Sequence, residues 1–105
     1  MVRALTWLTA AVVIAGTAMP MNARAADARR GETLALAHCG SCHIVAPHAR
    51  NEVADAPPFA VIAAKYGFDA GTIGSAITGP HPKMNFMPDP REAVDIAAYI
   101  ATLRP

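Results

Sequence analysis

The sequence Cys39-Gly40-Ser41-Cys42-His43 decides the fold of this chain, and an alanine-rich apolar stretch precedes it. A C-x-x-C-H run is the attachment pattern of c-type haem. The two thiols, three positions apart, can form thioethers with the two vinyl groups of one haem, and the next residue brings its imidazole under the iron. The small residues Gly40 and Ser41 let the chain turn tightly against the macrocycle. The sequence therefore predicts one covalently attached haem c, held by Cys39 and Cys42, with His43 as an iron ligand.

The same cysteines are compatible with three other interpretations. A Cys39–Cys42 disulfide would suit an exported protein. A thioredoxin-like redox pair requires a βαβ context, and no segment of the sequence shows sustained strand alternation. A zinc site requires a second pair of ligands at matching spacing, which His38, His48 and His81 do not form. An export signal and a small α-helical chain, described next, both favour haem over these three.

The N-terminal residues have the pattern of a secretory signal. Arg3 precedes an uncharged apolar run over residues 5–18, and Ala23-Arg24-Ala25 then fits the small-x-small rule for cleavage. The run is shorter than the roughly 18–20 residues that span a bilayer, which argues against an uncleaved membrane anchor. We therefore expect a cleaved signal peptide over residues 1–25, with Ala26-Asp27-Ala28 as a second cleavage option, and export to the bacterial periplasm.

Length and composition restrict the classes of protein that the chain can represent. It has 105 residues and a formal net charge of +1, so one small domain is the upper bound and a strongly basic nucleic-acid-binding protein is excluded. Loss of Arg3 and Arg24 with the signal would leave seven basic against eight acidic residues. A chain of about 80 residues is near the size at which a core alone becomes marginal, so a cofactor is expected to complete it.

The domain over residues 26–105 is predicted to be all-α, with three to four short helices and long loops that contain proline. Capping residues and apolar spacing predict helices over residues 28–38, 59–66, 70–77 and 90–104. In the first of these, Gly31 costs about 1 kcal/mol relative to alanine, which a helix tolerates only where another element packs closely. The proline-bearing stretch over residues 81–89 cannot form a regular helix.

The last helix carries the clearest signals. Asp89 is expected at its N-cap and Pro90 at its first position, with Glu92 three residues after the cap. Arg104 is expected to end it, as a cation near the negative end of the helix dipole. Its apolar face is predicted to consist of Ala93, Ile96, Ala97, Ile100 and Leu103.

From Ala28 to Leu103 the chain resembles a small bacterial class I c-type cytochrome. The family's first helix, which leads into C-x-x-C-H, is matched by residues 30–43, and its proline before an aromatic-bearing helix by residues 56–63. Its methionine in a proline-rich loop is matched by His81-Pro82-Lys83-Met84, and its last helix with an aromatic by residues 96–100. The resemblance implies the family's fold, with short helices wrapped around one haem.

The resemblance also implies roles for particular residues. His43 would be the proximal iron ligand, with a methionine sulfur on the opposite face. The backbone carbonyl of Pro57 would accept a hydrogen bond from the second ring nitrogen of His43, and Pro58 is the neighbouring alternative. In this family the first and last helices cross closely, which implies that Gly31 admits Tyr99 or its neighbours.

Two methionines compete for the position opposite His43. Met84 lies five positions before Asp89, which gives the loop room to rise past the haem and turn back, whereas Met87 lies only two positions before it. The spacing of the family loop also fits Met84 better. We therefore expect Met84 as the sixth ligand, with Met87 as the alternative and His81 as a weaker rival, since neutral imidazole also binds iron.

Two filled iron positions indicate a carrier of single electrons and not an enzyme. The leading expectation is a periplasmic monohaem cytochrome, a monomer or weakly associated subunit, that passes electrons between larger redox proteins. It would bind no nucleic acid and have no membrane span after signal cleavage. A haem c subunit of a periplasmic dehydrogenase or oxidase complex is the alternative, and an enzyme or gas sensor with an open sixth position is the third. Lys65 and Lys83 are candidate rim contacts for a partner, although solvated positions explain them equally well.

Overall fold

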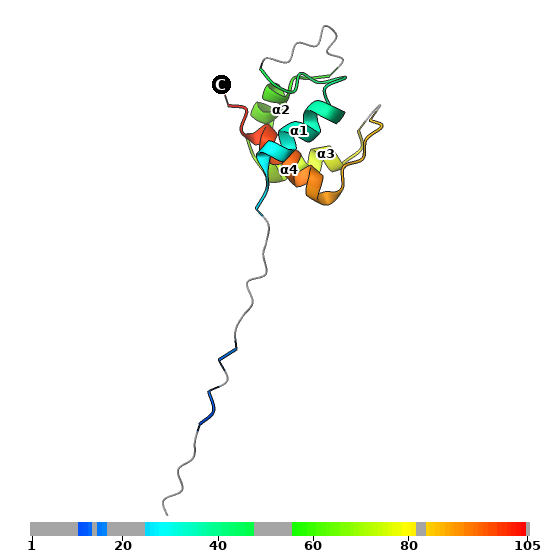
Figure 1. Cartoon of the computed structure of the whole chain (residues 1–105). Helices are drawn as coiled ribbons and strands as arrows, with labels where there is room; N and C mark the ends of the chain where they lie inside the picture. The colour runs from blue at the N-terminus through cyan, green and yellow to red at the C-terminus, as the bar shows by residue number, and fades with distance from the viewer. Residues whose placement is uncertain (1–10, 14, 17–24, 48–55, 82–83, 105) are drawn as a thin grey trace, which may run out of the picture.

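The computed structural model describes residues 11–13, 15–16, 25–47, 56–81 and 84–104. Within these residues the chain has no strand, and its helices are α1 (Ala28–His38), α2 (Phe59–Lys65), α3 (Ala70–Thr78) and α4 (Pro90–Ala101) (Figure 1). The prediction of an all-α chain with three to four short helices is confirmed. Throughout the part of the chain that the structure describes, every helix is too short or too polar to cross a bilayer. Most of the predicted signal peptide lies outside the described residues, as do His48 and Lys83.

Three of the helices begin at an aspartate. The side chain of Asp27 accepts from the Arg30 N–H at the start of α1, and that of Asp69 accepts from two N–H groups at the start of α3. At α4 the predicted capping box is present: the Glu92 N–H donates to Asp89 Oδ1 at 2.8 Å, and the Asp89 N–H donates to Glu92 Oε2 at 2.9 Å. Each such cap stabilises its helix by about 1 kcal/mol, which these short helices need.

The end of the last helix differs from the prediction. Helix α4 ends at Ala101, three residues before Arg104, and the Thr102 hydroxyl donates to the Tyr99 carbonyl at 2.6 Å. This local bond satisfies a carbonyl that a longer helix would have used. The Arg104 guanidinium lies 4.5 Å from the centroid of the Phe68 ring. The cation at the C-terminus therefore interacts with an aromatic face and not with the helix dipole.

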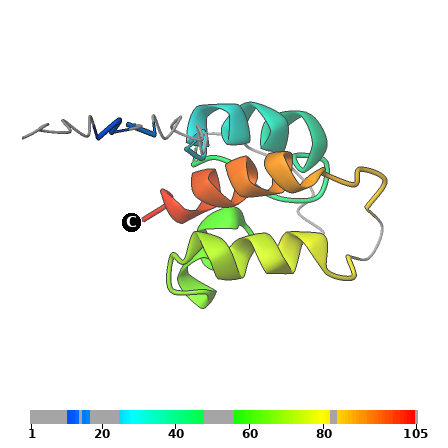
Figure 2. The same cartoon turned by 90° about the horizontal axis from the view of Figure 1, so that it is seen from below.

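Helix α4 lies at the centre of the fold. Figure 2 shows it between α1 and α3, and all three other helices contact it. Alanines make up much of the core, so the helices approach one another closely while burying little side-chain volume. The buried apolar residues of α4 are Ala93, Ile96, Ala97, Tyr99 and Ile100, which confirms the predicted face apart from Leu103, whose side chain is half-buried.

Helices α1 and α4 cross at Gly31. A Cβ atom at this position would overlap the backbone carbonyl of Asp95 and lie 2.9 Å from the backbone nitrogen of Ile96. The close crossing expected for Gly31 is confirmed, and the element that it admits is the backbone of α4 one turn before Tyr99. The Tyr99 hydroxyl instead donates to the Val45 carbonyl at 2.7 Å, in a buried position. Burial, and then the charge of Glu32, raise the pKa of Tyr99, which keeps this hydroxyl a donor.

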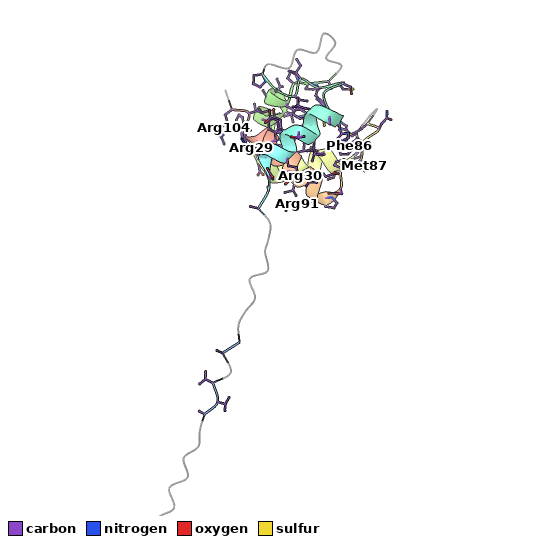
Figure 3. All side chains as sticks on the ribbon, viewed as in Figure 1. Arg29, Arg30, Phe86, Met87, Arg91 and Arg104 are labelled. Carbon is purple, nitrogen blue, oxygen red and sulfur yellow. The ribbon has the colours of Figure 1, made fainter. Side chains whose placement is uncertain are left out.

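A buried carboxylate joins the same two helices. Asp95 is fully buried, and it accepts from the Asp27 N–H at Oδ1 and from Arg30 Nη1 at Oδ2, both at 2.8 Å. Arg91 Nε lies 3.8 Å from Oδ1, so the guanidinium groups of Arg30 and Arg91 both lie beside the carboxylate. Figure 3 labels both arginines. Burial raises the pKa of Asp95, but the Asp27 N–H and the guanidinium groups of Arg30 and Arg91 lower it more, so the net shift is downward. The carboxylate is therefore charged at neutral pH.

Candidate haem site

The two cysteines and His43 lie in a tight turn at the C-terminal end of α1. The Cys39 N–H donates to the Ala35 carbonyl at 2.8 Å, which continues the helix into the motif. The Cys39 carbonyl then accepts from the Cys42 N–H at 3.2 Å and from the His43 N–H at 2.9 Å. Both thiols are free and half-buried. Burial, and then the neighbouring Cys42, raise the pKa of the Cys39 thiol, which keeps it neutral at pH 7.

The imidazole of His43 is buried and oriented by one short hydrogen bond. Its side chain is 8% exposed, and its Nδ1 lies 2.6 Å from the Pro57 carbonyl oxygen. Because a carbonyl only accepts, Nδ1 carries the proton and the lone pair of the ring is on Nε2. The prediction of Pro57 as the acceptor, in preference to Pro58, is confirmed. A histidine held in this way presents a nitrogen of fixed direction to a metal ion.

The turn that carries His43 is also tied to the start of α2. The Ala56 N–H donates to the Cys42 carbonyl at 3.1 Å, and the Phe59 N–H donates to the Ile44 carbonyl at 3.0 Å. The Phe59 ring lies 5.1 Å from the His43 ring, with the two planes tilted by 47°. Proline residues before α2 thus both start a helix and place the acceptor for His43.

The loop before α4 is attached to the same end of α1 by an aromatic contact. The Phe86 ring stacks on the His38 ring, with centroids 3.8 Å apart and planes inclined by 8°. Figure 3 shows Phe86 and Met87 on the side of the molecule away from Arg29 and Arg104. His38 directly precedes Cys39, so this contact brings the loop that carries Met84 beside the C-x-x-C-H turn. Met84 is half-buried, whereas Met87 is 77% exposed.

Two ring contacts of this region involve the other described histidines, His38 and His81. His38 is exposed, and its ring stacks on that of Phe86. The His81 ring lies near that of His43, at a centroid separation of 5.9 Å. The first contact has a weak signal in the sequence, an aromatic two positions after Met84, and the second agrees with the expectation of His81 as a weaker rival for the position opposite His43. Lys65, a candidate rim residue, places its ammonium 5.3 Å from the centroid of its neighbour Tyr66.

The fold and the site together define a small all-helical protein with a covalent haem motif and one buried, carbonyl-bonded imidazole. A curated protein named cytochrome c-552, from Bradyrhizobium diazoefficiens, is 43% identical to this chain over 95 residues, which cover 90% of this chain and 91% of the relative. No protein-family model matches the sequence, and no solved structure matches it.

The extent and identity of this match show that the chain belongs to the small class I c-type cytochromes. It is an electron-transfer protein that carries covalently bound haem c with its iron, and its predicted class, fold and cofactor are confirmed. The chemistry of the described donors fits this group: two thiols in one turn can form the thioethers, and the ring of His43 has its lone pair on Nε2.

Proposed function

We propose that this protein is a periplasmic one-electron carrier whose haem is attached through Cys39 and Cys42 and ligated by His43 and Met84. The bound haem supplies an iron that alternates between the ferric and ferrous states. The observation that carries the proposal is the 2.6 Å contact between His43 Nδ1 and the Pro57 carbonyl, because it fixes both the tautomer and the direction of the ring.

Met84 is the better candidate for the sulfur ligand. Its side chain is half-buried, whereas that of Met87 is 77% exposed and faces solvent. The stacking of Phe86 on His38 holds the Met84 loop next to the haem-attachment turn. Ligation by methionine and histidine raises the potential of the iron, and with both axial positions filled the protein passes electrons without binding oxygen.

The contacts of Asp27 support processing after Ala25. The Asp27 side chain caps α1 and its N–H donates to the buried carboxylate of Asp95. Cleavage after Ala28, the second option, would remove both interactions. Cleavage after Ala25 removes an exposed hydrogen bond from Arg91 to the Ala25 carbonyl, and exposed contacts of this kind contribute little. A signal peptide over residues 1–25 and a cytochrome domain over 26–105 therefore agree best with the contacts of α1.

The redox partners are proposed to be larger proteins that dock briefly. The domain over residues 26–105 carries nearly balanced charge, so long-range steering of a partner is weak. Size-exclusion chromatography of the purified holoprotein separates the two candidate roles: a freely soluble monomer supports the mobile carrier. Co-purification of the native protein with a dehydrogenase or oxidase subunit would instead support a fixed haem c subunit.

Intact-mass measurement on protein matured in a host with a haem c maturation system tests the attachment. We expect the mass of residues 26–105 plus one haem, and bare polypeptide for the Cys39→Ser/Cys42→Ser variant. Bare polypeptide from the unmodified chain would contradict the proposal. The mass of a haem-bearing chain that begins at Arg29 would contradict the proposed processing site but not the haem attachment.

Absorption spectra test the sulfur ligand. We expect Met84→Leu to remove the sulfur-to-iron band at the red end of the oxidised spectrum, and Met87→Leu to leave it unchanged. Leucine fills nearly the volume of methionine but cannot bind iron, so the fold is maintained. A band that persists in Met84→Leu and disappears in Met87→Leu would transfer the role to Met87.

A further inference from the structure

The distance between the His81 and His43 rings is the observation from which this inference starts. Its ring lies 5.9 Å from that of His43, measured between centroids, and the two planes are inclined by 19°. Rings packed directly on one another in this structure are much closer, as the 3.8 Å separation of His38 and Phe86 shows. The separation of the two imidazoles therefore leaves more space than direct stacking requires.

This separation matches that of two imidazoles bound to one metal ion from opposite sides. With metal–nitrogen bonds of about 2 Å on each side, the ring centroids lie roughly 6 Å apart. Because Nδ1 of His43 is engaged with Pro57, its Nε2, on the other side of the ring, is the nitrogen for the metal. The His81 ring is thus within the range needed for the coordination position opposite His43.

The His81 side chain is also accessible. It is exposed, and among the residues that the structure describes no hydrogen bond or ion pair holds its side chain. The residue lies just after α3, where the Gly79 N–H donates to the Ser75 carbonyl at 3.1 Å and fixes the start of the loop. Met84 is three positions further along the chain, so the two candidate ligands are close neighbours in sequence.

We propose that His81 is a reserve iron ligand, which takes the position opposite His43 when the sulfur of the loop methionine is absent or has left. This inference rests on the proposed haem ligation. The exchange breaks one iron–sulfur bond and forms one iron–nitrogen bond through the lone pair of a neutral imidazole, with no change in the oxidation state of the iron. Because a second ligand replaces the first, the sixth coordination position of the iron does not stay open. Two imidazoles also give the iron a lower reduction potential than histidine with methionine.

The test uses holoprotein in which neither loop methionine can bind iron. In Met84→Leu/Met87→Leu we expect a low-spin ferric iron with the electron paramagnetic resonance signature of two imidazoles. Addition of His81→Ala should abolish that signature and give a high-spin iron. Apparent affinity of the ferrous form for carbon monoxide should then increase at least about tenfold, because His81 no longer competes for the position.

A matched control removes the other described imidazole of this region. His38→Phe in the same methionine-free background keeps a ring for Phe86 to stack on, and we expect it to leave the low-spin signature intact. Helical circular dichroism of all variants checks that they fold. High-spin iron in Met84→Leu/Met87→Leu, or low-spin iron that survives His81→Ala, would overturn the proposal.

The two proposals fail in different ways. If the unmodified protein already has the signature of two imidazoles and His81→Ala abolishes it, the assignment of Met84 is wrong and that of His81 stands. If Met84→Leu removes the sulfur band but the iron of the methionine-free protein is high-spin, the assignment of Met84 stands and that of His81 is wrong.

Discussion

The crossing of α1 and α4 and the loop before α4 are held by very different forces. At the crossing, Gly31 lies against the backbone of α4 and Asp95 is enclosed by a backbone N–H and two guanidinium groups. Among the described loop residues, Phe86 contacts α1 through its stack on the His38 ring. The tightly packed crossing thus supports His43 through α1, while the described contact between the loop and α1 is a single ring pair.

This difference has a direct consequence for the haem iron. The backbone contacts of Cys39 and Cys42 and the carbonyl of Pro57 determine where the His43 imidazole lies. The loop before α4 carries the residues that we propose for the opposite side of the iron, Met84 and His81. Under the proposed ligation, the fold fixes one axial ligand and the loop supplies the other. Each prediction below weakens one of the two regions.

Substitution of Gly31 by alanine should have the largest effect. The new Cβ would overlap the carbonyl of Asp95, which is backbone in the middle of a helix and has no other conformation to adopt. We expect Gly31→Ala to lower the free energy of unfolding by about 3 kcal/mol, as for severe overpacking. Urea unfolding of the holoprotein, followed by circular dichroism, measures it.

Gly74→Ala is the matched control for this substitution. Gly74 lies in α3, which also packs on α4, but a Cβ there meets the Ala97 Cβ at 3.6 Å, an ordinary contact. Alanine also has the better helix propensity, so we expect a change between zero and about 1 kcal/mol in the stabilising direction. Equal destabilisation by the two substitutions would show that the α1 crossing is no tighter than the packing of α3.

Local signals in the sequence predicted much of this fold and site. Asp69 and Asp89 begin helices as expected, and the C-x-x-C-H turn follows directly from the end of α1. A cap or a turn involves residues within four positions of each other, so its physics is contained in a short stretch of sequence. The partner of His43 at Pro57 was predictable because the family's proline-led helix has a recognisable pattern.

Contacts between distant residues were not predictable in the same way. Asp95 pairs with Arg30, 65 positions away in the sequence. An aspartate in an amphipathic helix is usually solvent-exposed, whereas Asp95 is fully buried. Its place between Ala93 and Ile96 was a signal, since an acid on a buried face requires a partner. Nothing in the sequence alone predicts that Phe86 stacks on His38, because a half-buried ring and an exposed ring have many possible neighbours.

Substitution of Asp95 by asparagine should have the second largest effect. Asparagine can still accept from the Asp27 N–H, but the charge-assisted bond to Arg30 is lost. We expect a loss of about 2 kcal/mol at pH 7, within the range for hydrogen bonds to charged groups. Asp69→Asn is the control, since asparagine caps helices about as well as aspartate and the change should be close to zero.

The same variant predicts a pH dependence of stability. The pKa of Asp95 is lowered in the folded protein, so its contribution is fully present above the unfolded carboxyl pKa of about 3.9 and is lost as pH falls through the lower folded value. The difference in stability between the unmodified chain and Asp95→Asn should therefore be constant from pH 7 to about 5 and shrink in more acidic solution. A difference that grows as pH falls would contradict the charged state of this carboxylate.

Removal of the Phe86 ring should have the smallest effect on stability and a clear effect on the iron. Phe86→Ala removes the stack on His38, and such ring pairs contribute roughly 0.5–1.5 kcal/mol, so we expect a loss of about 1 kcal/mol. With the loop less firmly attached, the sulfur of Met84 should bind the iron for less of the time, and the red band of the oxidised protein should weaken. Phe86→Tyr keeps the ring and should retain the band. If Phe86→Ala retains the red band as well, the loop is held without the stack, by the buried Pro88 and the Asp89 cap. The loop that carries Met84 would then be more rigid than its contact with α1 indicates.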